Sequence, residues 1–170
     1  MPNVWFISDT HFFHDNILKF HGAGRPFASI EEMNETIVQK WNAVVKPADV
    51  VHHLGDVSFK LFQKEDEVDK LLSRLMGQKH LYMGNHDTLP SILSKHFCKI
   101  NLWKVFAKYN FVASHVPIPT RQFRNVTCQV HGHTHVNKMD DPHYINVCVE
   151  HTDFAPVHIE DIWAQTRKLI

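Results

Sequence analysis

The 170-residue chain has no net charge, no long apolar run and no basic leader. Its 18 Lys and Arg residues balance 18 Asp and Glu residues, so the formal charge is 0 with histidine counted as neutral. A membrane-spanning helix needs roughly 18 consecutive apolar residues, and the sequence contains no such run. The opening, MPNVWFISDT, also lacks the pattern of a secretory signal. We therefore expect no membrane partner and no extended nucleic-acid-binding surface.

Cysteine is scarce as well. Cys98, Cys128 and Cys148 are odd in number, and no two of them form a C-x-x-C pair. A disulfide framework or a zinc knuckle needs paired or closely spaced cysteines. We interpret the three as reduced thiols in a cytoplasmic protein.

The remaining composition indicates one globular domain that covers residues 1–170. Hydrophobic residues make up 44% of the chain and charged residues 21%, which suits a folded core. Histidine is the exception, with 15 of the 170 residues. Since histidine is ordinarily a minor residue, this abundance calls for an explanation.

The first half of the sequence alternates between strand and helix patterns. Short apolar runs that end at polar or glycine residues are typical of buried strands, and apolar residues at spacings of three and four are typical of amphipathic helices. Ser29 is the expected N-cap of the first helix, with Glu32 in the capping-box position. The expected strands are 4–7, 50–54 and 79–83, and the expected helices are 30–45, 65–76 and 91–96.

The second half changes to short β-branched or aromatic runs with little helix between them. A β-α-β-α-β half followed by a series of strands predicts an α/β sandwich with a mixed sheet. The expected strands of this half are 99–105, 109–114, 126–131 and 143–149.

Metal-binding side chains follow five of these strands. In open α/β sheets, ligands bind beyond the carboxyl ends of the strands. Carboxylate, amide and imidazole groups together suit divalent transition metals such as Mn, Fe, Co, Ni or Zn. The five segments are Asp9-Thr10-His11, Gly55-Asp56, Gly84-Asn85-His86-Asp87, Ser114-His115 and Gly132-His133-Thr134-His135.

Three glycines stand before these polar residues. Glycine tolerates positive φ and close backbone approach, so the following side chain can be aimed into a site. We expect this role for Gly55, Gly84 and Gly132.

In this order, the five segments resemble the calcineurin-like metallophosphoesterases, over residues 4–150. The opening FISDTHFFHDNI, the Arg25-Pro26-Phe27 segment and VVHHLGDV resemble the short, single-domain bacterial and phage members. The resemblance implies a four-layer α/β/β/α sandwich with two metal ions at its rim. It implies manganese first, with iron, nickel, cobalt or zinc as alternatives.

The resemblance also implies which residues hold the two metals. One carboxylate, Asp56, would bridge them, and His86 would stay off the metals and face the substrate phosphate. The first metal would be held by Asp9, His11, Asp56 and His135, and the second by Asp56, Asn85, His115 and His133.

The implied chemistry is phosphoester hydrolysis. Two adjacent metals can share a hydroxide and stabilise both the attacking and the leaving oxygen of an in-line displacement. We assign catalysis to His86, as proton donor or hydrogen-bond donor to the leaving oxygen, and to the bridging Asp56. Asn85 is a neutral ligand that limits negative charge near the phosphate, and it could contact the phosphate as well. The expected substrates are small or nucleotide-like phosphate esters, with diesters preferred.

Three further residues are candidate contacts to the substrate phosphate. His14 lies close to His11 in the sequence, whereas Arg25 and Arg121 lie in expected loops and could form bidentate contacts. Loop packing for His14 and a solvated surface position for each arginine are the alternatives.

One departure from the wider superfamily concerns His86. The protein Ser/Thr phosphatases carry G-D-x-x-D-R-G, but here Phe59 stands at the second Asp position. The partner that orients His86 is therefore not visible, and protein phosphatase activity is disfavoured. Asp87 could support His86 or cap the following turn.

Two other functions remain open. The chain could be a nuclease acting on short single-stranded nucleic acid, or a catalytically silent scaffold like the retromer subunit of the same superfamily. The complete set of expected ligands disfavours the scaffold, and the balanced charge disfavours polymeric DNA. We expect a monomer or a homodimer.

Overall fold

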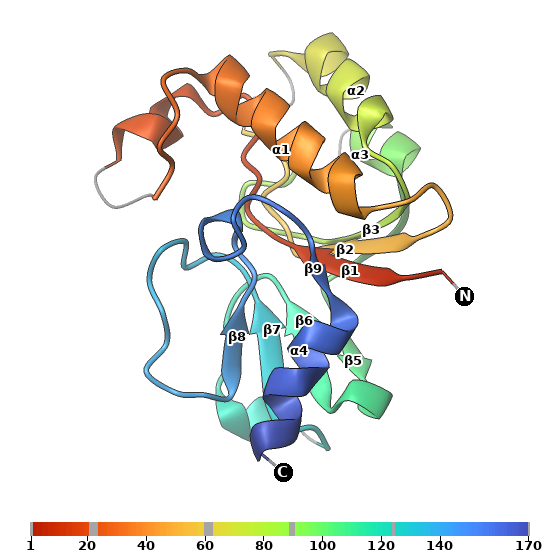
Figure 1. Cartoon of the computed structure of the whole chain (residues 1–170), viewed down its shortest axis with the longest axis vertical. Helices are drawn as coiled ribbons and strands as arrows, with labels where there is room; N and C mark the ends of the chain where they lie inside the picture. The colour runs from red at the N-terminus through yellow and green to blue at the C-terminus, as the bar shows by residue number, and fades with distance from the viewer. Residues whose placement is uncertain (1, 21–23, 60–62, 89–90, 124, 170) are drawn as a thin grey trace.

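The computed structural model describes residues 2–20, 24–59, 63–88, 91–123 and 125–169. Two mixed β-sheets stack on each other, with helices on both sides (Figure 1). The α/β/β/α sandwich implied by the resemblance is therefore confirmed.

The first sheet has the strand order β4-β3-β2-β1-β9. Its first four strands are parallel, and β9 runs antiparallel to β1. The strands are β1 (Val4–Ile7), β2 (Val50–His53), β3 (Gln78–Tyr82), β4 (Phe97–Asn101) and β9 (Val157–His158).

The second sheet has the order β5-β6-β7-β8. Strand β5 is antiparallel to β6, and the other neighbours are parallel. The strands are β5 (Trp103–Phe106), β6 (Phe111–Ser114), β7 (Cys128–His131) and β8 (Tyr144–Asn146).

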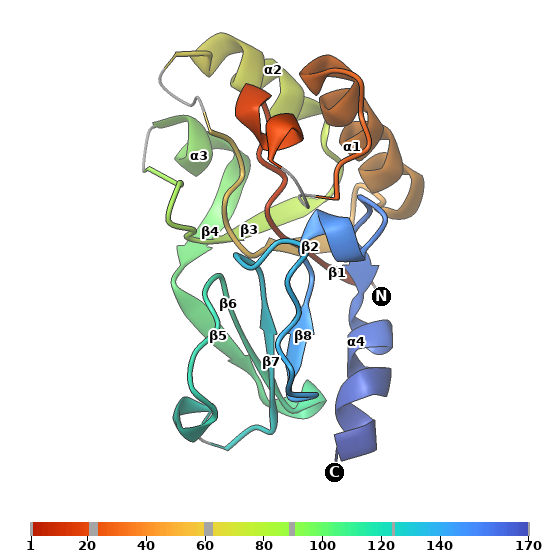
Figure 2. The ribbon, with the colours of Figure 1, turned by 90° about the vertical axis from the view of Figure 1, so that its left-hand side faces the viewer.

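Helices cover the sandwich on both sides (Figure 2). The first sheet is covered by α1 (Ile30–Val44), α2 (Glu65–Arg74) and α3 (Ser91–His96), while α4 (Ile159–Thr166) lies against the second sheet. Ile159 and Ile162 of α4 share a core with residues of both sheets. None of the helices in the described ranges combines the length and hydropathy that a membrane crossing requires.

The start of α1 follows the expected capping pattern with one difference. Ser29 Oγ accepts a hydrogen bond from the Glu32 amide at 3.1 Å, but the Glu32 carboxylate accepts from the Ala28 amide at 2.7 Å. A cap of this kind stabilises a helix by about 1 kcal/mol. The apolar residues of α1 then reach the core as the periodicity predicts.

Two apolar cores lie on opposite faces of the first sheet, one beneath α1–α3 and one between the sheets. Adjacent histidines on β2 reach one core each, as alternation along a strand requires. His52 stacks on Phe6 between the sheets, and His53 lies near Trp41 on the helical side. Burial lowers the pKa of each to about 3, so both are neutral packing residues.

The structure corrects several element boundaries. The run 99–105 forms two strands in different sheets, because the chain crosses from β4 to β5 at Leu102. Strand β6 begins at Phe111, since Asn110 adopts a left-handed conformation with φ of 59°. Strand β9 and helix α4, near the end of the chain, were not predicted from the sequence.

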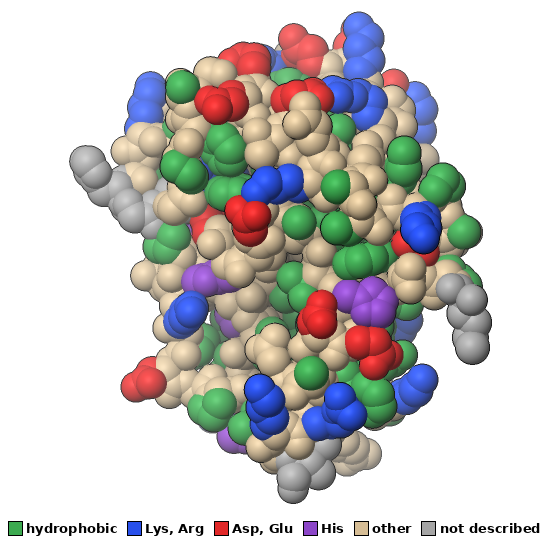
Figure 3. Space-filling view, in the orientation of Figure 1, with side chains coloured by type: hydrophobic (Ala, Val, Ile, Leu, Met, Phe, Trp, Pro, Cys, Tyr) green, Lys and Arg blue, Asp and Glu red, His purple; other side chains and the backbone are tan. Residues whose placement is uncertain are grey.

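Basic and acidic side chains are interspersed over the face seen in Figure 3. This mixture agrees with the zero formal charge of the chain.

Candidate metal centre

The polar segments expected at the strand ends do converge on one rim. The five segments follow β1, β2, β3, β6 and β7. The two sheets meet at this rim. The Ser8 amide donates to Val147 O at 3.0 Å, and the Val149 amide donates to Ser8 O at 3.1 Å. This short parallel bridge joins the end of β1 to the chain beyond β8, so ligands from both sheets share one site.

Most candidate ligands sit at sharp backbone turns. A non-glycine residue with positive φ is uncommon, and such strain of about 1–3 kcal/mol each gathers at functional sites. The surrounding hydrogen bonds hold these turns and aim the side chains inward. The candidate ligands with positive φ are Asp9, His11, Asp56, His133 and His135.

The first cluster comprises Asp9, His11 and His135, whose ligand atoms all lie within 4.8 Å of one another. Asp9 Oδ1 is 3.7 Å from His11 Nε2 and 3.8 Å from His135 Nε2. Ligand atoms about 2.0–2.2 Å from a shared cation are roughly 3–4 Å apart. The spacing therefore fits one divalent cation.

The second cluster comprises Asp56, His115 and His133, again within 4.8 Å. Asn85 joins it, because its Oδ1 lies 2.9 Å from His115 Nε2 and 2.9 Å from His133 Nδ1. A carboxylate, an amide oxygen and two imidazoles form a second donor set of the same kind.

Asp56 lies between the two clusters. Its Oδ2 is 3.5 Å from His11 Nε2 on one side and 3.5 Å from His115 Nε2 on the other. Its second oxygen, Oδ1, accepts a hydrogen bond from the His86 amide at 2.9 Å. Asp56 thus has the position of a carboxylate shared by two cations.

Two buried ligand atoms of the first cluster also indicate a metal ion. Asp9 Oδ1 and His11 Nε2 are buried and find no hydrogen-bond partner within the described part of the chain. A buried polar atom without a partner is costly, and a cation coordinated by both atoms removes that cost.

The protonation states of Asp9 and His11 suit metal binding. Burial raises the pKa of Asp9, but the neighbouring His11 and the charge of His115 outweigh it and hold that pKa well below its usual range. Burial lowers the pKa of His11. Asp9 is therefore an anion and His11 a neutral imidazole, as ligands must be.

A second layer of hydrogen bonds fixes Asp9. Its Oδ2 accepts from Ser8 Oγ at 2.5 Å, from the His133 amide at 2.9 Å and from Cys148 Sγ at 3.2 Å. Oδ1 alone is left facing the other ligands.

Gly132 lets the backbone pass close to this carboxylate. A Cβ at this position would overlap Ser8 Oγ and Asp9 Oδ2, so only glycine fits without a shift of these atoms.

Arg25 has partners different from those expected. Its buried guanidinium bonds Glu150 Oε1 at 2.8 Å through Nε and the Asp9 carbonyl at 2.5 Å through Nη2. Nη1 donates to the Thr10 carbonyl at 3.1 Å. The donors of Arg25 are directed at the protein, so the structure gives the expected phosphate contact no support.

Glu150 in turn holds a candidate ligand. Its Oε1 lies 2.9 Å from His135 Nδ1. Burial lowers the pKa of His135, but the hydrogen bond to Glu150 and the charge of Asp9 raise it above its ordinary value. The contacts from Arg25 to Glu150 and from Glu150 to His135 orient the imidazole. Glu150 was not predicted from the sequence.

His14 also contacts a ligand rather than open solvent. Its Nδ1 lies 3.3 Å from His11 Nδ1, and its ring stacks on Phe59 at 3.8 Å. Burial and the neighbouring positive groups lower the pKa of His14 to about 4. A neutral His14 can accept the Nδ1 proton of His11 and leave His11 Nε2 free for a cation.

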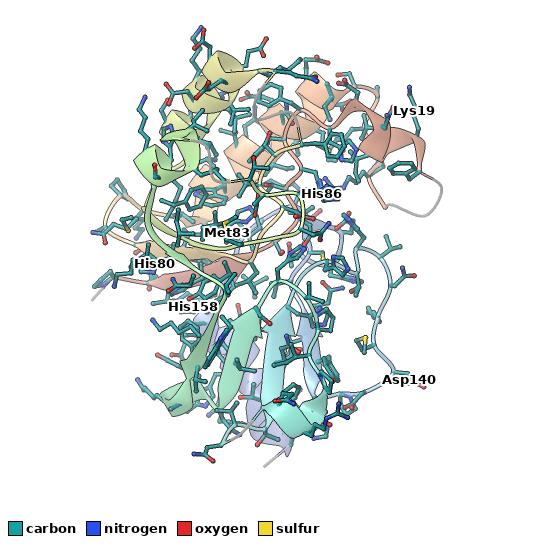
Figure 4. The ribbon with its side chains drawn as sticks, turned by 180° about the vertical axis from the view of Figure 1, so that it is seen from behind. Lys19, His80, Met83, His86, Asp140 and His158 are labelled. Carbon is teal, nitrogen blue, oxygen red and sulfur yellow. The ribbon has the colours of Figure 1, made fainter. Side chains whose placement is uncertain are left out.

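His86 is exposed at the rim, above the second sheet in the view of Figure 4. Its ring lies edge-on to His11 at 5.5 Å and to Phe59 at 5.3 Å. Within the described part of the chain, Asp87 forms no hydrogen bond with the ring. Its carboxylate accepts from the amides of Asp56, Val57 and Gly84 and so fixes the two turns that carry Asp56 and Asn85.

Arg121 lies apart from the cluster. It is exposed on the 3-10 helix Thr120–Gln122, the teal turn at the bottom of Figure 2. This turn precedes the amino end of β7, whereas the candidate ligands follow the carboxyl end. The placement gives the expected phosphate contact no support.

The fold and the two ligand clusters are typical of metallophosphoesterases, and comparison with known families supports the same class. A family model of the calcineurin-like phosphoesterases matches residues 2–165. The chain belongs to this family.

Several relatives are similar over most of the chain. An uncharacterized protein of Methanocaldococcus jannaschii is 34% identical over 94% of this chain and 89% of its own length. The gene 66 protein of Mycobacterium phage L5 is 29% identical over 80% of this chain and 61% of its own length. A crystal structure of a protein of unknown function from Aquifex aeolicus matches with a TM-score of 0.74, 29% identity and full coverage of both chains.

Proposed function

We propose that this protein is a dinuclear metal-dependent phosphodiesterase of the cytoplasm, acting on small or nucleotide-like phosphate esters. The position of Asp56 carries the proposal: one carboxylate oxygen lies 3.5 Å from a histidine of each cluster. A carboxylate between two metal-ligand sets can hold two cations close together, which suits two-metal phosphoryl chemistry. The free thiols agree with a reducing compartment.

The residues present fit two divalent cations, of which manganese is the first choice. Asp9, His11 and His135 would hold one, Asn85, His115 and His133 the other, and Asp56 both. When bound, such ions supply Lewis-acid activation of the phosphoryl group and of the attacking water.

His86 supplies the proton donor for the leaving oxygen. Its main chain is anchored on Asp56 Oδ1, while its ring remains exposed at the rim. The ring can therefore reach a substrate without giving up a structural contact. We assign it proton donation to the departing alkoxide.

A diester fits the charge of the rim better than a monoester does. A phosphomonoester carries up to two negative charges near neutral pH, whereas a diester carries one. Arg25 is committed to Glu150, and Arg121 lies beyond the amino end of β7. Neither arginine compensates the second charge, so we propose diesters as the preferred class.

The first test is hydrolysis of bis-p-nitrophenyl phosphate with added manganese. Asp56→Asn and His86→Ala should each lower kcat by about 100-fold or more, in the range that general acid–base groups contribute. Glu160→Gln, an exposed change at the start of α4, is the control and should retain full activity. Absence of turnover with Mn, Ni, Co and Zn alike would reject the proposal.

A second test addresses the nucleophile. In oxygen-18 water, a single turnover should place one solvent oxygen in the product phosphate, because we assign direct attack by water. Trapping of a covalent phospho-protein would contradict this assignment.

A further inference from the structure

A groove of about 420 Å³ leads away from the metal centre over the outer face of the second sheet. His115, a candidate ligand of the second metal, is one of its lining residues. Met83, which directly precedes Gly84-Asn85, lines it as well; Met83 and His86 are both labelled in Figure 4. Its walls also include Leu102, Trp103, Val116 and Phe123. We refer to this space as the apolar groove.

The apolar groove collects apolar side chains that the fold leaves in water. Eight large apolar residues are exposed in the described part of the chain, and four of them line this groove. They are Leu102, Trp103, Val105 and Val116, with exposed fractions of 70%, 55%, 36% and 46%. Scattered exposed apolar residues need no explanation, but a contiguous patch beside a polar site marks a binding surface.

One wall of the apolar groove is fixed in advance by a buried glutamine. The Gln129 side chain accepts from the Ile118 amide at 2.8 Å and donates to the Val116 carbonyl at 2.9 Å and to Ser114 Oγ at 2.6 Å. Tyr144 also donates to the Ile118 carbonyl at 2.8 Å. The wall is therefore formed before a ligand arrives, which lowers the entropic cost of binding.

Resting on the phosphodiesterase activity proposed above, we propose that the apolar groove binds the flat, uncharged aromatic group of the phosphoester, a nucleobase or an aryl ring. The phosphate of the same molecule lies at the metal centre. His115 belongs to both, so the groove adjoins the metal centre, and we infer that one substrate occupies both.

The chemistry of the lining selects this ligand class. Among the described lining residues, His115 is the one titratable side chain, so a charged group gains little from these residues. Trp103 offers an exposed aromatic ring, and bases stack on such rings irrespective of their sequence identity. A volume of about 420 Å³ lies in the range of small-molecule sites and accommodates one such ring system with water.

The test compares inhibitors that share a phosphate and differ in the attached group. Phenyl phosphate and AMP should inhibit the hydrolysis of bis-p-nitrophenyl phosphate more strongly than methyl phosphate does. Trp103→Ala should raise the inhibition constants of phenyl phosphate and AMP by about tenfold, because it removes one stacking surface. The constant for methyl phosphate should not change. Trp103→Phe keeps an aromatic ring and should retain most of the preference.

Trp163→Ala is the matched control. It removes a partly exposed tryptophan from α4, which does not line the apolar groove. This variant should leave all three inhibition constants unchanged. A Trp103→Ala protein that binds phenyl phosphate and AMP as tightly as the wild type would overturn the proposal. An equal loss of affinity for methyl phosphate would overturn it too, since it would place the effect at the metal centre.

Calorimetric titration with phenyl phosphate and methyl phosphate, in manganese, separates this inference from the proposed activity. If the protein binds phenyl phosphate in a Trp103-dependent manner but hydrolyses no diester, the apolar groove stands and the phosphodiesterase assignment fails. If diesters are hydrolysed without any aromatic preference, the activity stands and the groove assignment fails. Comparison of AMP with phenyl phosphate decides whether the occupant is a nucleobase or a simple aryl ring.

Discussion

Glu150 Oε1 lies 2.9 Å from Nδ1 of His135, on the side of the ring opposite the candidate metal position. The contact places the ring proton on Nδ1, so Nε2 is free to bind a cation. Arg25 bonds the same carboxylate at 2.8 Å and ties it to the backbone of Asp9. A carboxylate behind a ligating histidine fixes its orientation and raises its basicity.

Replacing Glu150 should therefore weaken metal binding without removing a ligand. Glu150→Gln should lower the affinity of the first metal by about 10- to 100-fold. Titration of the metal-free protein with manganese in a calorimeter measures this directly. Glu160→Gln on the exposed start of α4 should bind manganese as the wild type does. Wild-type affinity in a folded Glu150→Gln protein would show that the contact does not tune the site.

The close approach at Gly132 gives a second prediction. In Gly132→Ala the new methyl group would overlap Ser8 Oγ and Asp9 Oδ2, so the Asp9 carboxylate must shift. We expect manganese affinity to fall more than tenfold and unfolding free energy to fall by about 1–3 kcal/mol. Gly77→Ala is the control, because Gly77 has φ of 88° but packs near Val45 and Asp49 instead of the rim. It should lose about 1–2 kcal/mol of stability and keep its metal affinity.

The sequence predicted the ligand cluster because its signal is local. Each polar segment directly follows an apolar run, and a shared rim follows from parallel strands. Asp9, His11, Asp56, Asn85, His115, His133 and His135 accordingly lie together in the structure. The main helices and buried strands were also predicted within a few residues, since periodicity is a local property.

The supporting contacts could not be predicted in the same way. Arg25 and Glu150 are 125 positions apart, and no spacing rule joins them. Cys148 reaches Asp9 because of the bridge between Ser8 and Cys148, which depends on the packing of the two sheets. The helix α4 had a usable signal in Ile159, Ile162 and Thr166, three buried residues at spacings of three and four.

Metal binding should also stabilise the fold, since it provides partners for the buried Asp9 Oδ1 and His11 Nε2. A ligand at 100 times its dissociation constant stabilises a protein by about 2.7 kcal/mol. We therefore expect manganese to raise the Tm of the metal-free protein by several degrees, and EDTA to reverse this. Asp9→Asn should abolish most of the increase. An equal manganese-induced shift in Asp9→Asn would place the stabilising ion elsewhere.

Acid should destabilise the metal-free protein through His52, whose imidazole is buried between the sheets. Burial and the charges of His80, Lys104 and Lys99 lower its pKa to about 3, against about 6.5 in the unfolded chain. The stability that depends on neutral His52 is therefore complete above about pH 6.5 and is lost as the pH falls toward 3. Between pH 7 and pH 5 the loss should be about 2 kcal/mol, at about 1.36 kcal/mol per pH unit below 6.5.

Urea unfolding of wild type and His52→Phe at both pH values, in EDTA, measures this contribution. His52→Phe should lose about 2 kcal/mol less than the wild type between pH 7 and pH 5, because phenylalanine binds no proton. Tyr82→Phe removes the hydroxyl that lies 3.0 Å from His52 Nδ1 but keeps the imidazole. That control should lower stability by a similar amount at both pH values. Equal acid sensitivity of His52→Phe and the wild type would mean that other groups, such as His53, carry the effect.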